Sequence, residues 1–228
     1  MTNPQLSYQN DPSLKSRFCA HVERHRQLDM LHQGSYGEAP DERGFPGPKW
    51  RGCAVACSLR SLDEIDGAVL KHTNNDHAGL AKRLGIPLVL ACLEDQIFEG
   101  LPAEPAQLWP TRFAQAIPIG RDLSMVWPRL AHWLLVDEAQ GVIRFANTDQ
   151  TRDSIRAVAA LFARHIAGDP PSADEWRSAR YAAAAARYAA AADAAADAAA
   201  AAAAARYAAR SDHYEALAAK LCELMAAA

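Results

Sequence analysis

The chain has 228 residues, of which 50% are hydrophobic, and this is the size of one domain with an appendage. Its net charge of −3 gives no electrostatic attraction to nucleic acid or to an anionic membrane, and no apolar run is long enough to span a bilayer. Five cysteines are too few, and odd in number, for a disulfide framework. The composition predicts a soluble protein of a reducing compartment, with neither nucleic acid nor membrane as a partner.

The first part of the chain predicts a polar, loose N-terminus at 1–12 and then a helix at 13–33. Ser13 can cap this helix, and apolar residues follow at helical spacing: Leu14, Phe18, Val22 and Leu28. The N-terminus has no basic start followed by an apolar run, so no signal peptide is expected. Residues 34–50 are dense in glycine and proline, which predicts a loop.

Two cysteines follow this loop, Cys53 and Cys57, on one face of a predicted helix. Their spacing differs from the C-x2-C of a zinc knuckle, and two small buried thiols are one interpretation. The other is a reactive thiolate or a zinc site with the nearest histidines, His72 and His77, because a helix start lowers the pKa of a thiol. The candidate metal ligands are therefore these four residues, and no other cofactor is predicted.

A strong amphipathic helix is predicted at about 87–100. Its apolar arc includes Leu90, Leu93, Ile97 and Phe98, while Asp95 and Glu99 lie on the opposite, solvent-facing side. Glu94 falls inside the apolar arc. A buried carboxylate has to be paired, hydrogen-bonded or protonated. Glu94 is thus either half of an internal ion pair, with Arg51, Arg112 or Arg129, or the acid of a catalytic set whose other candidates are Cys53, Cys57 and His77.

Three further elements complete the predicted core domain, 13–168. A second helix begins at Trp109 and Pro110, and a third runs from Leu123 to Val136. Residues 142–145 could form a brief extended segment. Thr148 or Asp149 caps a helix that continues to about residue 167, with four side chains directed inward: Ile155, Val158, Phe162 and Ile166.

The tail at 172–226 begins with a capping box, Ser172 with Glu175, and continues as an alanine-rich segment that strongly favours helix. The sequence predicts one long helix, with a break near Ser211 as the alternative. An apolar seam of Leu217, Leu221 and Leu224 suits docking of the end of the tail. Exposed tyrosines offer contact area to a protein partner or to a second chain: Tyr181, Tyr188, Tyr207 and Tyr214. The predicted fold class is all-α, with a compact multi-helix domain and this helical tail.

Five segments resemble a family of uncharacterised proteins from bacteriophages and prophages, many of which carry an Ala/Tyr-rich C-terminal tail. The segments are GCAVACSL (52–59), LGIP (84–87), LEDQIFEGLP (93–102), WP (109–110) and AIPIGRDLS (116–124). Ala56 stands where the pattern of that family has glycine. The resemblance implies an accessory protein in the cytoplasm of a bacterial host, and it carries no activity with it.

These observations lead to three functional hypotheses. The first is a helical interaction protein that binds and modulates a host protein, since the chain has none of the common nucleotide-binding or hydrolase motifs. The second is an enzyme or metal-binding protein that uses the Cys/His/Glu set. The third is a structural scaffold that oligomerises through its tail.

Overall fold

The structure, a computed structural model, describes five stretches of the chain: 5–34, 50–68, 76–146, 148–181 and 201–228. Of residues 201–210 it describes the backbone alone. Within these stretches the regular elements are α-helices and short 3-10 helices, so the prediction of an all-α fold is confirmed. None of the described helices is long and apolar enough to cross a membrane.

The chain divides into two compact units. Unit 1 combines Met1–Ser124 with Tyr214–Ala228, and unit 2 is Met125–His213. This division differs from the predicted core domain at 13–168 and tail at 172–226. The boundary after Ser124 falls inside the predicted core domain, and the end of the tail belongs with the N-terminal part of the chain.

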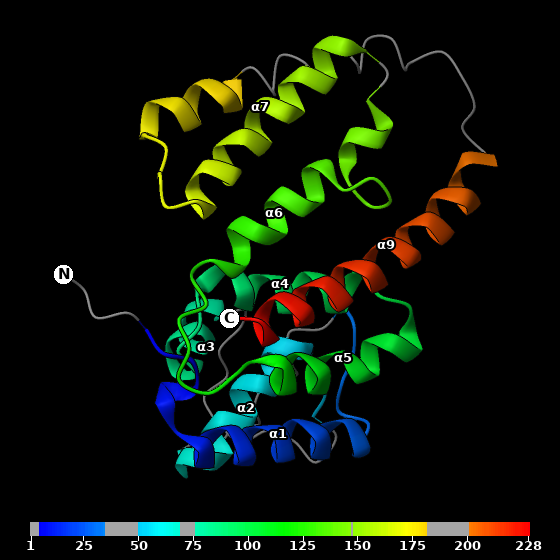
Figure 1. The fold of residues 1–228 in the computed structure, drawn as a ribbon. Helices are drawn as coiled ribbons and strands as arrows, with labels where there is room; N and C mark the ends of the chain where they lie inside the picture. Colours follow the sequence, from blue (N-terminus) through cyan, green and yellow to red (C-terminus); the bar gives the residue numbers. More distant parts are fainter. Residues whose placement is uncertain (1–4, 35–49, 69–75, 147, 182–200) are drawn as a thin grey trace. The chain divides into compact units, whose positions relative to one another are not determined.

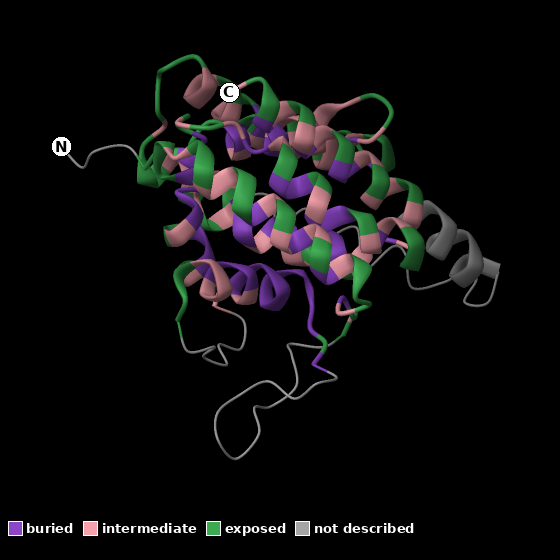
Figure 2. Ribbon diagram, turned by 90° about the horizontal axis from the view of Figure 1, so that it is seen from below, coloured by how far each residue is buried: buried purple, intermediate pink, exposed green. Residues whose placement is uncertain are grey.

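Unit 1 is built around α2, which packs against three other helices, α1, α3 and α4. Eight of the thirteen residues of α2 are buried, so it occupies the centre of the core. The unit consists of η1 (Ser7–Asn10), α1 (Pro12–Gln27), α2 (Ala54–Asp66), α3 (His77–Leu84), α4 (Leu88–Gly100), α5 (Ala103–Ala116) and the end of α9 (Ala201–Ala226) (Figure 1). Buried positions mark the inward sides of its helices, whose outward sides are exposed (Figure 2).

Residues 5–10 form hydrogen bonds across unit 1, although the sequence predicts a loose N-terminus at 1–12, of which residues 1–4 lie outside the described residues. Tyr8, Gln9 and Asn10 all have positive φ angles, which cost about 1–2 kcal/mol for each residue that is not glycine. The segment offsets this cost with hydrogen bonds that span the unit. The Tyr8 hydroxyl donates to the Ala114 carbonyl at 2.6 Å, and Gln9 donates to the Lys82 carbonyl at 2.7 Å at the end of α3.

The first long helix differs from the prediction at both ends. Asp11, rather than Ser13, is the N-cap, and its carboxylate accepts from the Ser13 N–H at 2.7 Å. The helix ends at Gln27 because the chain turns through Asp29, which has a left-handed φ of 53°. Leu28, predicted to point inward, is therefore 57% exposed.

The helix predicted to begin at Trp109 and Pro110 begins six residues earlier, at Ala103. Pro110 consequently lies inside α5, where its ring nitrogen has no hydrogen to donate. The helix tolerates the proline because the residues near it, Trp109 and Phe113, are packed in the core. Trp109 and Phe113 are fully buried, with ring centroids 5.6 Å apart.

The end of α9 packs into unit 1, as the apolar seam suggests. Leu217, Leu221 and Met225 are buried, whereas Leu224 is only half-buried. Tyr214 lies against Gly100 at the end of α4, where a Cβ atom would stand 2.2 Å from the tyrosine ring. The helix runs through Ser211 without the break considered above, and the preceding tail residues 182–200 lie outside the described residues.

Unit 2 contains α6 (Val126–Val136), η2 (Val142–Phe145), α7 (Asp149–Ile166) and a helix at 173–181. The predicted Thr148 cap of α7 is confirmed, since its hydroxyl accepts from the Thr151 N–H at 3.1 Å. The capping box is also present: the Ser172 hydroxyl accepts from the Glu175 N–H at 3.3 Å, and the Glu175 carboxylate accepts from the Ser172 N–H at 2.8 Å. The prediction of an extended segment at 142–145 is wrong.

Candidate functional site

Three helices of unit 1 bring polar side chains together in the core. We call these residues the polar cluster: Cys53 and Ser58 from the start of α2, His77 from α3, and Glu94 and Asp95 from α4. Cys53, Ser58 and Glu94 are almost completely buried, and the side chains of His77 and Asp95 are 18% and 14% exposed. Cys53 and His77 both interact with Asp95, the residue that follows Glu94, although they are far apart in the sequence.

Glu94 is buried, as its position in the apolar arc predicts, but its partner is not an arginine. The Ser58 hydroxyl donates to Glu94 Oε1 at 2.8 Å, and Glu94 Oε2 is buried without a hydrogen-bond partner among the described residues. Burial raises the pKa of Glu94 to about 8, against the lowering effect of Ser58, and the charge of Asp95 raises it further. Glu94 is thus held mostly in its neutral form at pH 7.

Asp95 is the member of the cluster for which the prediction of a solvent-facing position is wrong, since its side chain is only 14% exposed. His77 Nε2 donates to Asp95 Oδ2 at 3.2 Å. The short connection through Gly85 and Pro87 folds α3 back onto α4, and the two helices pack together. His77 lies eight residues before Gly85, and Asp95 lies eight residues after Pro87. At about 1.5 Å per residue both are about 12 Å from the turn, so this equal separation could have identified the pair.

The two cysteines are buried thiols rather than thiolates. Burial raises the pKa of Cys53 to about 12, and the nearby Asp95 carboxylate adds to the effect. Hydrogen bonds from backbone N–H groups at the start of α2 lower it, but they are outweighed. The interpretation of two buried thiols is therefore confirmed for their burial, and the alternative in which the helix start lowers the pKa of Cys53 is not supported. Burial also raises the pKa of Cys57 well above its usual value, and its thiol contacts the carbonyls of Gly52 and Met30 at 3.6 and 3.7 Å.

The polar cluster does not provide a complete set of metal ligands within the part of the chain that the structure describes. No three His, Cys, Asp or Glu side chains among the described residues are arranged to hold a metal ion. His72, one of the predicted ligands, lies outside the described residues. Zinc binding by Cys53, Cys57 and His77 thus has no geometric support in this cluster.

Alkylation of the native protein with iodoacetamide at pH 8 should leave Cys53 and Cys57 unmodified, because their thiols are buried and stay protonated. The half-buried Cys19, Cys92 and Cys222 should react first. Peptide mass spectrometry measures each site, and all five cysteines should react after unfolding in guanidinium chloride. Fast modification of native Cys53 would instead identify it as a nucleophile.

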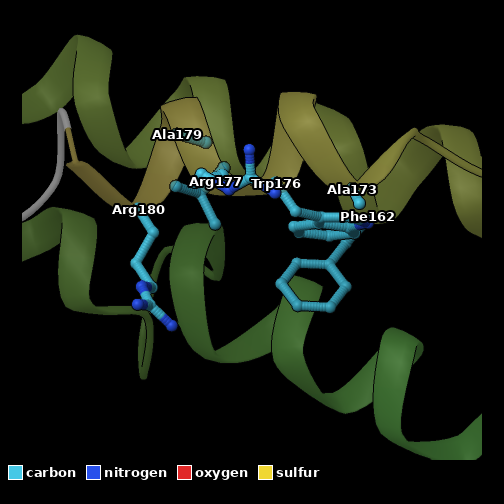
Figure 3. Close-up of a pocket in the computed structure, with 7 residues that line it drawn as sticks. Phe162, Ala173, Trp176, Arg177, Ala179 and Arg180 are labelled. Atoms are coloured by element: carbon cyan, nitrogen blue, oxygen red, sulfur yellow. The ribbon is translucent and has the colours of Figure 1, made fainter.

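Unit 2 carries a second candidate site, a hollow between α7 and the 173–181 helix with a volume of about 650 Å3. We call it the aromatic hollow. Its apolar lining consists of Val158, Phe162, Ala173, Trp176 and Ala179. The ring centroids of Phe162 and Trp176 lie 4.8 Å apart at 60°. Figure 3 shows these two side chains next to each other. A smaller hollow of about 340 Å3 shares these two rings and includes Trp127 of α6.

The aromatic hollow exists because α7 is amphipathic and its apolar face is only partly buried by the rest of the described unit. Only one of its eighteen residues, Ala159, is buried, although its sequence predicts four inward apolar side chains. Those four are half-buried. Large apolar side chains left partly open to water in this way are typical of binding surfaces.

The tyrosines singled out in the tail do not act as one set. Tyr181 is 66% exposed at the end of the 173–181 helix, whereas Tyr214 is half-buried against α4. Tyr188 lies outside the described residues, as does the side chain of Tyr207. Of the four predicted interaction residues, Tyr181 alone is described and exposed.

Comparison with known proteins yields no relative. No protein-family model, no curated protein and no solved structure matches this chain.

Proposed function

We propose that this protein is a helical interaction protein that binds a segment of another protein in the aromatic hollow of unit 2. The observation that carries the proposal is the incomplete burial of α7, which leaves Phe162 of this helix and Trp176 of the next partly open to solvent. A volume of about 650 Å3 lies within the range of about 300–1,000 Å3 found for binding sites. Aromatic side chains, tryptophan above all, contribute much of the free energy at protein interfaces.

The other two hypotheses have less support. A cysteine enzyme needs a thiolate, and both burial and the charge of Asp95 oppose ionisation of Cys53. A scaffold that oligomerises through its tail needs an available tail surface, and the last residues of α9 are already packed in unit 1. The resemblance to phage and prophage proteins makes a bacterial host protein the expected partner, whose activity the bound protein would modulate.

Ala179→Glu tests this function. Ala179 lines the hollow, so a glutamate there would fill part of it and place a charge in its apolar lining. Capture from a bacterial lysate, followed by titration with the purified partner, should show at least tenfold weaker binding by this variant than by the wild type.

Ser178→Glu is the matched control, because Ser178 is exposed in the same helix and receives the same charge without lining the hollow. It should bind the partner like the wild type. Equal binding by Ala179→Glu and Ser178→Glu would contradict the proposed function. Failure of the wild type to retain any specific partner would contradict it as well.

A further inference from the structure

We infer that the segment bound in the aromatic hollow is an acidic amphipathic helix, with apolar side chains toward Phe162 and Trp176 and carboxylates toward Arg177 and Arg180. This inference rests on the proposed function and specifies the chemistry of the partner.

The shape of the hollow fits a helix. Its lining residues come from two neighbouring helices, and within each they recur at the three- and four-residue spacing of one helix face. On the 173–181 helix this row runs from Ala173 to Arg180, a length of about 10 Å at 1.5 Å per residue. A groove of this kind between two helices accepts the apolar face of a third helix of two to three turns.

The charge at the rim of the hollow is positive. Its charged lining residues, among those that the structure describes, are Arg177 and Arg180, which extend from the same helix as Trp176 (Figure 3). Because they are three residues apart, their side chains leave the helix on neighbouring positions of one face. Carboxylates three or four residues apart on a partner helix have the matching separation.

Both arginines are available to pair with a carboxylate of the partner helix. Arg177 pairs with Asp174 at 2.7 Å, but these side chains are 61% and 83% exposed, and such a surface pair contributes little. None of the ion pairs between described residues involves Arg180. The neighbouring acid, Glu175, already serves Arg164 and the capping box, which hold its pKa at about 2. The rim therefore offers guanidinium groups for bidentate pairing.

A nucleic acid is the other ligand that arginine and tryptophan could suggest, and the structure favours it less. Trp176 is half-buried and packs against Phe162, so its ring is not a free stacking platform. The rim has two arginines in a chain whose net charge is −3, and this is too little positive charge for a phosphate backbone.

Fluorescence anisotropy with the full chain tests the inference. The probes are three fluorescein-labelled peptides of sixteen residues, each with leucines at helical spacing and with glutamate, glutamine or lysine at the flanking positions. The wild type should bind the glutamate peptide at least tenfold more tightly than the glutamine peptide, and the difference should shrink in 0.5 M NaCl. Arg180→Glu should abolish this preference and strengthen binding of the lysine peptide.

Arg156→Glu is the matched control, an exposed arginine on α7 that does not line the hollow, and it should retain the wild-type preference. Equal binding of the glutamate and glutamine peptides by the wild type, or equal effects of Arg156→Glu and Arg180→Glu, would overturn the inference that the partner is acidic.

The proposed function would still stand if Ala179→Glu weakens binding of the captured partner. Displacement of the peptide by a single-stranded oligonucleotide, or no binding of any peptide, would also overturn the inference. A dimer of the wild type that light scattering detects, and that Ala179→Glu abolishes, would overturn the inference in favour of a second copy of this chain.

Discussion

Replacing Glu94 with glutamine is expected to make the protein progressively more stable than the wild type as the pH rises from 4.5 to 8. In the unfolded chain the Glu94 carboxyl releases its proton near pH 4.5, whereas in the core it keeps the proton up to a pKa of about 8. Below pH 4.5 both states are protonated and the residue has no linkage effect. Between the two values the unfolded state ionises first, so stability falls with pH.

The expected size of this effect is large. A rise in pKa from 4.5 to about 8 corresponds to up to about 5 kcal/mol of stability lost by the wild type above pH 8. The free energy of unfolding of a natural domain is only about 5–15 kcal/mol in total. Glutamine has the same shape, can still accept from the Ser58 hydroxyl, and does not ionise, so the variant should lack this loss.

Urea denaturation between pH 4 and 9 measures the difference, and Glu104→Gln is the matched control. Glu104 is exposed at the start of α5, so its replacement should change stability by a few tenths of a kcal/mol at every pH. Parallel stability curves for the wild type and Glu94→Gln would show that Glu94 is ionised in the folded protein. Glu64 is surrounded by His25, Arg60 and His21, which lower its pKa to about 2, so its ionisation changes stability only below pH 4.5.

The second large effect is expected in α9. Leu221→Ala should cost about 3 kcal/mol, since the Leu221 side chain is completely buried and its removal leaves a cavity in unit 1. Leu224→Ala changes the same residue type in the same helix, at a half-buried position, and should cost less than about 1 kcal/mol. The helix propensities of the two variants are identical, so packing alone separates them.

Denaturant unfolding of the full chain gives these values, and amide hydrogen exchange should locate the loss of protection in α4 and α5 of unit 1. If the two variants cost the same, the end of α9 does not pack in unit 1 in solution. The prediction thereby also tests whether the tail is a free rod, as the scaffold hypothesis requires.

The sequence predicts the elements that depend on local chemistry. The helix at Leu88–Gly100, the Thr148 cap and the Ser172 capping box are all confirmed, because apolar periodicity and capping side chains act within a few residues. The burial of Glu94 is predicted for the same reason, since it follows from the position of one residue within a periodic arc.

What the sequence misses depends on contacts between distant segments. The positive φ angles of Tyr8 and its two successors are stabilised by hydrogen bonds to residues more than seventy positions away. Asp95 looks like a surface residue until α3 folds over it and places His77 beside it. The pKa of Cys53 depends on the same carboxylate, so a local argument from the helix start alone gives the wrong direction.

The inclusion of 214–228 in unit 1 has a consequence for the order of events during synthesis. The helices α1–α5 emerge from the ribosome first, and the residues that complete their core are made only after the whole of 125–213. At roughly 5–20 residues per second this interval lasts roughly 5–20 s. Throughout it, the apolar surface that later covers Leu221 and Met225 faces solvent. The nascent chain thus exposes apolar surface during synthesis that the finished protein buries.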